Sequence, residues 1–513
     1  MLAKVLSGAT VGIETRLVEV EVDIASRGLP SLTVVGLPER SVEEAKERIR
    51  AAIVNTGTDF PARRITVNLA PADLPKEGGA YDLPMAIAIL AAAGEVPMER
   101  LKTVLVVGEL SLSGEVRHAN GVLLLALLAR REKLEEVFLP AEDAREGAVV
   151  EEVKIMPVKS LIELVRHLRG GERIVQAEKV KIDELVRSQA VVAEFDLAEV
   201  VGQEQAKRAL EIAAAGGHNL HLKGPPGAGK TMLARALPSI MPTMEVEEAL
   251  EVTKIYSVTG NLPTGAAVVG VRPFRSPHHT ISRMGLVGGG RVPMPGEISL
   301  AHRGVLFLDE FPEFPRGVLE ALRQPMEDGV VSISRAAGTM RYPASFQLAA
   351  ASNPCPCGYF NSRVRNCTCL PGQIVKYQRR VSGPILDRID LHVDVPEVEV
   401  EKLTGGGWKG GESSKLVRER VERARERQLV RFGKKGIFAN ARMTSAIIKK
   451  ECPLSVECLR LLRQAVEKFG LSARAYFKTV KIARTIADLA GEKEIGPGQI
   501  AEALQYRPSE SGA

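Results

Sequence analysis

The chain has 513 residues, of which 45% are hydrophobic and 26% charged, and its formal net charge is +6. These values are typical of globular proteins and exclude an intrinsically disordered chain, and the length predicts about three domains. Because no apolar run is long enough to span a bilayer and residues 1–16 lack a signal-peptide pattern, we expect a cytoplasmic protein that contacts no membrane.

The first part of the chain, residues 1–168, is expected to be an α/β domain. The alternating run Leu17-Val-Glu-Val-Glu-Val-Asp is typical of a strand, and residues 41–55 show a helical pattern. Gly170 and Gly171, followed by a charged stretch, predict a linker over residues 169–189. A helix should begin near Val200 and lead into the next domain.

A phosphate-binding loop follows the alternating run 220–223 and precedes a helical pattern that begins at Met232. The loop consists of Gly224, Pro225, Pro226, Gly227, Ala228, Gly229, Lys230 and Thr231. Its backbone amides can cradle phosphates, Lys230 can reach the β and γ oxygens, and the Thr231 hydroxyl can bind Mg²⁺. The pattern predicts a nucleotide hydrolase that uses ATP and Mg²⁺.

Polar residues at the ends of two apolar runs complete this site. Asp309 follows the run 306–308 and would hold Mg²⁺ opposite Thr231, and Glu310 would polarise the attacking water. The run 346–352 ends in Asn353, where a parallel strand could present the amide to the γ-phosphate. We therefore expect a central domain with a parallel sheet.

Two further segments of this domain carry arginines. Residues 265–303 are rich in glycine, proline and arginine, and such long insertions are usually functional. Residues 330–341 predict a β-hairpin with Arg335 and Arg341 beside a glycine turn. The two arginines could bind phosphates, or the hairpin could be structural with solvated arginines.

Four of the six cysteines form two C-x-C pairs, Cys355 with Cys357 and Cys367 with Cys369. One loop could offer all four thiolates to a structural Zn²⁺, although the usual zinc pair is C-x-x-C. Four reduced loop cysteines are the alternative, because disulfides are rare in cytosolic proteins.

The C-terminal part is predicted to be helical. Residues 404–414 form a glycine-rich linker ending in the expected N-cap Ser414, residues 415–507 contain four amphipathic segments, and residues 508–513 form a tail. The first helix places Arg420, Arg427 and Arg431 near one face. They could contact DNA phosphates or belong to a solvated, salt-bridged helix.

Several motifs make this chain resemble the magnesium-chelatase branch of the AAA+ ATPases. Asn353 matches the sensor-1 position, the segment 383–390 resembles the one that carries an arginine finger, and the segment 471–475 resembles the sensor-2 motif. The resemblance implies that Arg388 enters the neighbouring subunit's site and that Arg474 reaches the nucleotide from a helical lid. It places the AAA+ domain at 190–403 and the lid at 415–507.

The resemblance becomes closer in segments that look like signatures of the ComM/YifB family. These are Arg272-Pro-Phe-Arg-Ser-Pro-His-His-Thr, Val287-Gly-Gly-Gly, Pro295-Gly-Glu-Ile-Ser-Leu-Ala-His and Asn353-Pro-Cys-Pro-Cys-Gly. Family members are hexameric AAA+ motors, and one of them is associated with DNA branch migration in natural transformation. The resemblance implies a homo-oligomeric ring acting on single-stranded, duplex or branched DNA, with the insertion 265–303 facing its pore. A protein-remodelling or chelatase-type assembly ATPase is the alternative.

The N-terminal domain resembles Lon-type proteases in the segments 74–82 and 108–123. Ala80 occupies the position of the nucleophilic serine and Leu123 that of the catalytic lysine. A Ser-Lys dyad needs a hydroxyl and an amine, so we expect a Lon-like fold without peptidase activity.

Overall fold

The computed structural model describes residues 2–36, 40–74, 76, 78–189, 195–291, 293–335, 338–362, 365–397, 411–433 and 437–508. The chain divides into two compact units, which are described separately. The first contains residues 1–187 and 245–270, and the second contains residues 188–244 and 271–513.

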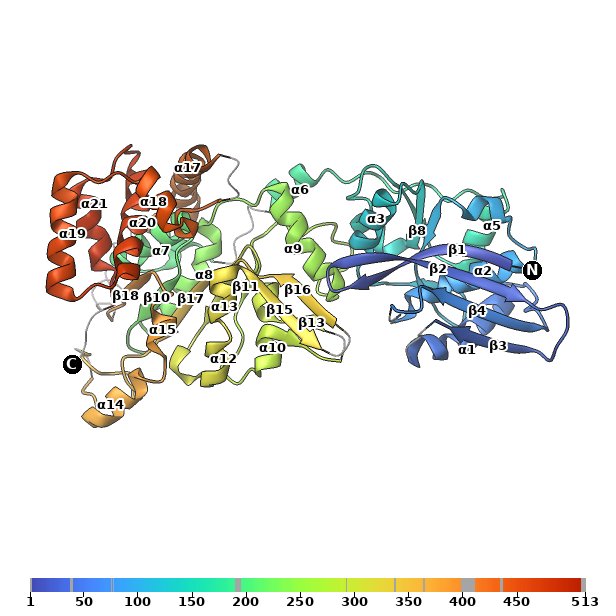
Figure 1. Cartoon of the computed structure of the whole chain (residues 1–513), viewed down its shortest axis with the longest axis horizontal. Coiled ribbons are helices and arrows are strands. Elements are labelled where there is room, and N and C mark those ends of the chain that lie inside the picture. Colours follow the sequence, from blue (N-terminus) through green and yellow to red (C-terminus); the bar gives the residue numbers. More distant parts are fainter. Residues whose placement is uncertain are drawn as a thin grey trace. The chain divides into compact units, whose positions relative to one another are not determined.

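The first unit is built on a seven-stranded mixed sheet of order β3-β4-β2-β1-β5-β8-β9 (Figure 1). Its strands are β1 (Leu2–Val11), β2 (Glu14–Ile24), β3 (Ser31–Val35), β4 (Arg64–Ala70), β5 (Val104–Val106), β8 (Glu136–Pro140) and β9 (Lys154–Val158), with a separate small hairpin of β6 (Glu109–Leu110) and β7 (Val116–Arg117). In β2, Val18, Val20 and Val22 are buried and alternate with more exposed residues, as expected for a strand with one face on the core. The strand pattern predicted for this region is confirmed.

Helices surround this sheet. They are α1 (Arg40–Asn55), α2 (Asp82–Ala92), α3 (Val122–Arg131), α4 (Ala144–Gly147), α5 (Leu161–Leu168), α6 (Ile182–Gln189) and α9 (Val246–Val258). The α2 helix is buried along its whole length and forms the centre of the core. Residues 169–187, most of the expected linker 169–189, belong to this unit: Ile174 is buried, and the Ala177 amide donates to the Ile155 carbonyl.

The α9 helix lies between two segments of the second unit in the sequence but packs with the first unit. The Ser257 hydroxyl donates to Oε1 of the buried Glu146 at 2.6 Å, and this oxygen also accepts from the Leu123 amide at 2.7 Å. The Gly121 amide donates to the Ser257 carbonyl. Residues 245–270, which were expected to belong to the domain 190–403, are therefore bound to the N-terminal α/β unit.

The second unit contains a five-stranded sheet of order β11-β14-β17-β10-β18, with every neighbouring pair parallel. The strands are β10 (Leu220–Lys223), β11 (Phe274–Arg275), β14 (Val305–Leu308), β17 (Gln347–Ser352) and β18 (Leu391–Asp394). All residues of β14 and β17 are buried, because helices cover both faces of a parallel sheet. The predicted central domain with a parallel sheet is confirmed.

Smaller elements surround this sheet. The helices are α7 (Glu204–Gly216), α8 (Lys230–Ile240), α10 (Arg283–Val287), α11 (Glu297–Leu300), α12 (Arg316–Glu320), α13 (Arg323–Asp328), α14 (Pro371–Gln378) and α15 (Gly383–Leu386). Two hairpins are formed by β12 (Gly288–Gly289) with β13 (Met294–Pro295) and by β15 (Val330–Arg335) with β16 (Gly338–Pro343).

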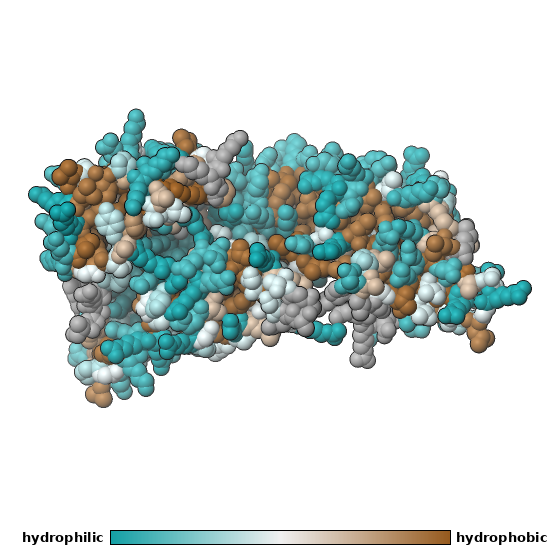
Figure 2. All heavy atoms as spheres, viewed as in Figure 1, coloured by the Kyte–Doolittle hydropathy of each residue, from teal (hydrophilic) through white to brown (hydrophobic). Residues whose placement is uncertain are grey.

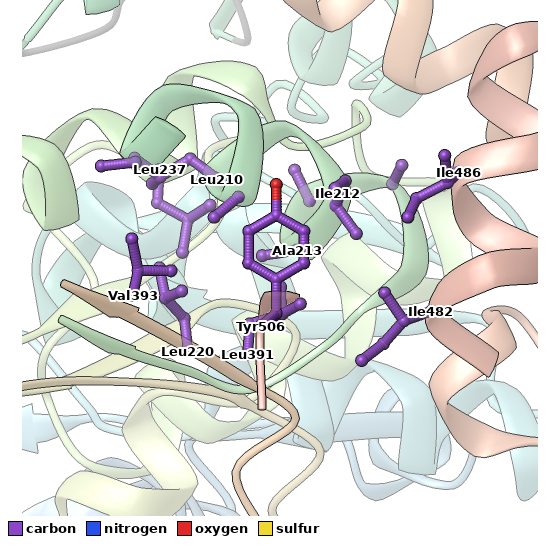
Figure 3. Close-up of a cluster of buried hydrophobic side chains, with 14 of the residues drawn as sticks. Leu210, Ile212, Ala213, Leu220, Leu237, Leu391, Val393, Ile482, Ile486 and Tyr506 are labelled. Carbon is purple, nitrogen blue, oxygen red and sulfur yellow. The ribbon is translucent and has the colours of Figure 1, made fainter. Parts of the chain in front are cut away.

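The C-terminal helices are α17 (Ser414–Phe432), α18 (Ser445–Glu451), α19 (Val456–Phe469), α20 (Ala473–Ala490) and α21 (Pro497–Gln505). Figure 3 shows how they share a core with the sheet: Tyr506 lies among Ile212 of α7, Leu391 of β18 and Ile482 of α20. On the visible face of this unit, hydrophilic side chains separate the apolar patches (Figure 2). Among the described helices, none has the length and apolarity needed to cross a bilayer.

The start of α17 differs from the prediction. Ser413 is the N-cap, whereas the expected N-cap Ser414 is the first residue of the helix and is buried. The Ser414 hydroxyl accepts from the Leu197 amide and is hydrogen-bonded to the Ser239 hydroxyl, at 2.7 Å each. Residues 404–410 of the predicted glycine-rich linker lie outside the described residues, as do residues 509–513 of the predicted tail.

Candidate functional site: a phosphate loop and an arginine cleft

The phosphate loop connects β10 to α8, as the motif requires. Gly229 is the N-cap of α8 and has a φ of 86°, a conformation that glycine adopts without strain. A Cβ on Gly224 would lie 2.1 Å from the Val395 carbonyl oxygen, so only glycine allows the loop to leave the sheet here. The first turn of a helix directs its amides outward, and these amides favour anions such as phosphate.

The loop and the strand ends form one open cleft. It is lined by Pro226, Gly227, Ala228, Gly229, Lys230, Thr231, Met232, Ser276, Pro277, His278, His279, Asp309, Glu310 and Asn353. The Thr231 hydroxyl donates to Oδ2 of Asp309 at 2.8 Å. Both side chains therefore lie where one Mg²⁺ could bind them together.

Lys230 lies almost buried beneath this cleft. Its Nζ donates to the carbonyls of Gly224 and Pro225 at 2.7 Å and to Oδ1 of Asn353 at 3.1 Å. Burial lowers the pKa of Lys230 to about 8, and the carboxylate of Asp309 opposes this shift. The ammonium of Lys230 thus lies at the phosphate loop, where phosphate oxygens could replace these carbonyls as its partners.

This pKa predicts a pH-dependent affinity for nucleotide. Bound phosphate favours the ammonium, so nucleotide affinity should be greatest below the free-enzyme pKa of about 8 and should fall as the pH rises through it. One linked proton gives a decrease of up to about tenfold per pH unit. Fluorescent ATP-analogue titrations between about pH 7.5 and 9.5, which bracket this pKa, measure the decrease. Lys230→Arg, which stays charged, should bind with an affinity that does not change over this range, and a flat wild-type profile would contradict the assignment.

Glu310 has a strained backbone and an unexpected partner. Its φ is 51°, which is uncommon for a residue with a side chain, and such strain is often found at functional sites. Its Oε2 lies 3.1 Å from Nδ1 of His279. His279 belongs to the insertion 265–303, part of which thus lines the nucleotide cleft. In the sequence this histidine stands out only as part of a family signature, and its contact with Glu310 was not predicted.

Arg388 and Arg474 do not line the nucleotide cleft. Both pair with Oε1 of Glu327, at 2.7 Å from Nη2 of Arg388 and 2.6 Å from Nη2 of Arg474. These ion pairs lower the pKa of Glu327. The structure therefore brings the two predicted arginines together, but in a second cleft of the same unit.

The second cleft, called the arginine cleft below, carries more positive than negative groups. Its charged residues are Arg388, Arg442, Arg474, Lys478 and Lys481, against Glu327, Asp387 and Asp390. It shares no lining residue with the nucleotide cleft. Burial lowers the pKa values of Lys478 and Lys481, so an anion entering this cleft would favour their charged forms.

The arginines of α17 make intramolecular contacts. Arg420 pairs with Glu211 of α7 at 2.6 Å and with Glu412, and Arg431 donates to the buried Asp488 of α20 at 3.0 Å. Arg427 donates to the Asp488 carbonyl. These contacts support the salt-bridged interpretation of this helix.

The four clustered cysteines converge. Their sulfurs all lie within 4.8 Å of one another, and the six cysteines of the chain are free.

In the N-terminal unit, Leu123 is fully buried and Ala80 is half-buried. The nearby Lys76 is buried and donates from Nζ to the carbonyls of Gly36, at 3.0 Å, and Pro71. The Lon-like fold and the expected lack of peptidase activity stay predictions.

A parallel sheet of this order, with a phosphate loop after β10 and acids after β14, defines a protein of the AAA+ phosphate-loop class. Family models described as "Magnesium chelatase, subunit ChlI", "Subunit ChlI of Mg-chelatase" and "Magnesium chelatase, subunit ChlI C-terminal" match residues 196–403, 20–143 and 411–507. The chain belongs to the ComM/YifB family of magnesium-chelatase-like AAA+ proteins.

Two of the relatives cover nearly the whole chain. The competence protein ComM of Haemophilus influenzae is 46% identical over 506 residues, which are 99% of this chain and 97% of the relative. The YifB protein of Salmonella typhimurium is 44% identical over 506 residues, again 99% of this chain and 97% of the relative. The magnesium-chelatase 38 kDa subunit of Rhodobacter capsulatus is 27% identical over 178 residues, 31% of this chain and 50% of that subunit.

Proposed function

We propose that this protein is a ring-forming ATPase that couples ATP hydrolysis to movement along DNA, acting as a helicase or branch-migration motor in recombination or natural transformation. The main support for ATP hydrolysis is the nucleotide cleft, which is lined by Lys230, Thr231, Asp309 and Glu310. Magnesium-chelatase-like AAA+ proteins are expected to hydrolyse ATP with Mg²⁺. Support for DNA as the substrate comes from the relationship to a competence protein and from the surface of the β15–β16 hairpin.

The separation of the two clefts supports a ring. Arg388 and Arg474 are paired in the arginine cleft, whereas the phosphate loop opens into the nucleotide cleft. An arginine that stabilises the transferring phosphoryl group must reach the γ-phosphate, and a second copy of the chain could bring its arginine cleft there. A closed ring, with a hexamer implied by the family, would complete every site in this way.

The β15–β16 hairpin has one packed face and one exposed face. Val331, Ile333 and Tyr342 are buried, and the Tyr342 hydroxyl donates to the Pro293 carbonyl at 2.5 Å. Arg341 is exposed and pairs in register with Ser332. The hairpin therefore presents a basic side chain and hydroxyls to solvent, a surface suited to phosphates. Arg335, the other arginine predicted for this hairpin, is the last residue of β15, and its side chain lies outside the described residues.

Arg341→Ala tests this surface. We expect weaker binding to every DNA sequence, and the slope of log affinity against log salt should become shallower by about one unit if Arg341 neutralises one phosphate. Fluorescence anisotropy measures both the affinity and its salt dependence. It would use labelled single-stranded, duplex and branched DNA between roughly 50 and 200 mM salt, the range over which phosphate binding weakens. Arg460→Ala, an exposed arginine of α19, is the control. An unchanged affinity and slope for Arg341→Ala would remove the hairpin from the proposal.

A further inference from the structure

The four clustered cysteines lie in the segment between β17 and α14. The Sγ of Cys355 lies 3.4 Å from that of Cys357 and 3.7 Å from that of Cys367, and the Sγ atoms of Cys357 and Cys367 are 3.6 Å apart. A tetrahedral Zn²⁺ with Zn–S distances of about 2.3 Å places its sulfurs about 3.8 Å apart. The separations of the three sulfurs are thus close to those of a zinc tetrathiolate, and Cys369 is the fourth ligand available.

Backbone amides orient the sulfurs. The Phe360 amide donates to Sγ of Cys355 at 3.3 Å, and the Cys357 amide donates to Sγ of Cys369 at 3.4 Å. Such hydrogen bonds favour thiolates and fix the direction of ligands in metal sites. In the described part of 353–370 there is no helix or strand, so few backbone hydrogen bonds hold this segment. A metal ion would give it a defined conformation.

The same segment contacts the nucleotide site at two points. Cys355 lies two residues after Asn353 in the sequence, and Oδ1 of Asn353 accepts a hydrogen bond from Lys230. Gly358 lies against the phosphate loop, because a Cβ there would be 2.5 Å from Cδ and 2.6 Å from Cγ of Pro226. Gly358 has a φ of +85°, which also favours glycine, and its amide donates to the Cys355 carbonyl at 3.0 Å. The position of the cysteine loop therefore affects both Asn353 and Pro226.

We propose that Cys355, Cys357, Cys367 and Cys369 bind one structural Zn²⁺, and that the metal-held loop supports the phosphate loop through Gly358 and positions Asn353 beside Lys230. On binding, the four thiols lose their protons to solvent and four Zn–S bonds form, with no change in oxidation state. Zinc takes no part in hydrolysis; it keeps the nucleotide cleft in its binding conformation. This inference does not depend on DNA as the substrate.

The metal content tests the first half of the proposal. Full-length protein purified without chelators from zinc-supplemented cells should contain about one zinc per chain by elemental analysis. The double variant Cys367→Ser, Cys369→Ser should lose it, whereas Cys458→Ala, a buried cysteine outside the cluster, should retain it. Replacement by Co²⁺ should give the visible spectrum of a tetrahedral tetrathiolate. Wild-type protein without zinc that also fails to bind added Zn²⁺ or Co²⁺ would overturn the site.

Gly358→Ala tests the second half without altering a ligand. The added methyl group contacts Pro226 and the positive φ becomes strained, so affinity for a fluorescent ATP analogue should fall roughly tenfold while the zinc content stays unchanged. Gly372→Ala is the matched control, because a Cβ there meets no atom within 4 Å. Thermal unfolding shows whether each variant is folded. Unchanged nucleotide affinity in folded Gly358→Ala protein would overturn the supporting role of the loop.

Discussion

Glu310→Gln is expected to leave ATP bound and to slow its hydrolysis by roughly 10²–10⁴-fold, the usual contribution of a general base. Glu310 lines the nucleotide cleft beside Asp309, and its backbone amide donates to Oδ1 of that aspartate at 2.9 Å. Glutamine keeps the size of the side chain but cannot accept the proton of the attacking water. Binding should persist because Lys230 and Thr231 are unchanged.

The measurement combines ATP-analogue binding with steady-state phosphate release. Glu313→Gln is the control, because Glu313 is an acid of the same segment that pairs with Arg380 outside the cleft lining. It should hydrolyse ATP at nearly the wild-type rate. If Glu310→Gln turns over like the wild type, Glu310 is not the base, and His279, its partner at 3.1 Å, becomes the next group to replace.

Arg388→Ala is expected to reduce kcat by roughly 10³-fold or more, as for other arginines that enter a neighbour's phosphoryl-transfer site. Nucleotide affinity should change much less, because Arg388 does not line the nucleotide cleft. Arg474 would still pair with Glu327 in this variant, so the arginine cleft keeps part of its ion pairing. Arg379→Ala, an exposed arginine that lines neither cleft, should be close to wild type.

Mixing two inactive variants shows whether the site is shared. Lys230→Ala subunits retain Arg388 but should lose nucleotide binding or turnover, and Arg388→Ala subunits retain the phosphate loop. In a mixed ring, some interfaces would combine an intact loop with an intact arginine, so ATPase activity should exceed the sum of the two variants measured alone. Activity that never exceeds this sum, in mixtures shown to exchange subunits, would place Arg388 in its own subunit's site or outside catalysis.

The parts of the site that the sequence predicted are those encoded locally. The run 220–223 and the phosphate loop follow each other directly in the chain, so their geometry is set by neighbouring residues. The buried strand before Asp309 and the strand before Asn353 could be recognised for the same reason. The carboxyl ends of adjacent parallel strands lie at one edge of the sheet, which brings these residues together.

The features that the sequence did not predict depend on contacts between distant segments. His279 meets Glu310 only because the insertion folds back over the cleft. The sequence left open whether the arginines of α17 contact DNA phosphates or form salt bridges, because their carboxylate partners Glu211 and Asp488 lie on helices far away in the sequence. Likewise, nothing local to α9 shows that Ser257 will donate to Glu146 of the N-terminal unit. Periodicity predicts a helix, but it does not identify the surface against which the helix packs.

DNA-dependent stimulation of the ATPase would show whether ATP hydrolysis serves movement on DNA. The steady-state rate of the full-length protein would be measured without DNA and with single-stranded, duplex and four-way branched DNA of equal nucleotide content. The proposal predicts a rate that rises with at least one of these DNAs and is lost in Glu310→Gln. An ATPase that is active alone, but is neither bound nor stimulated by any of the three, would contradict the proposal and favour an assembly ATPase that acts on proteins.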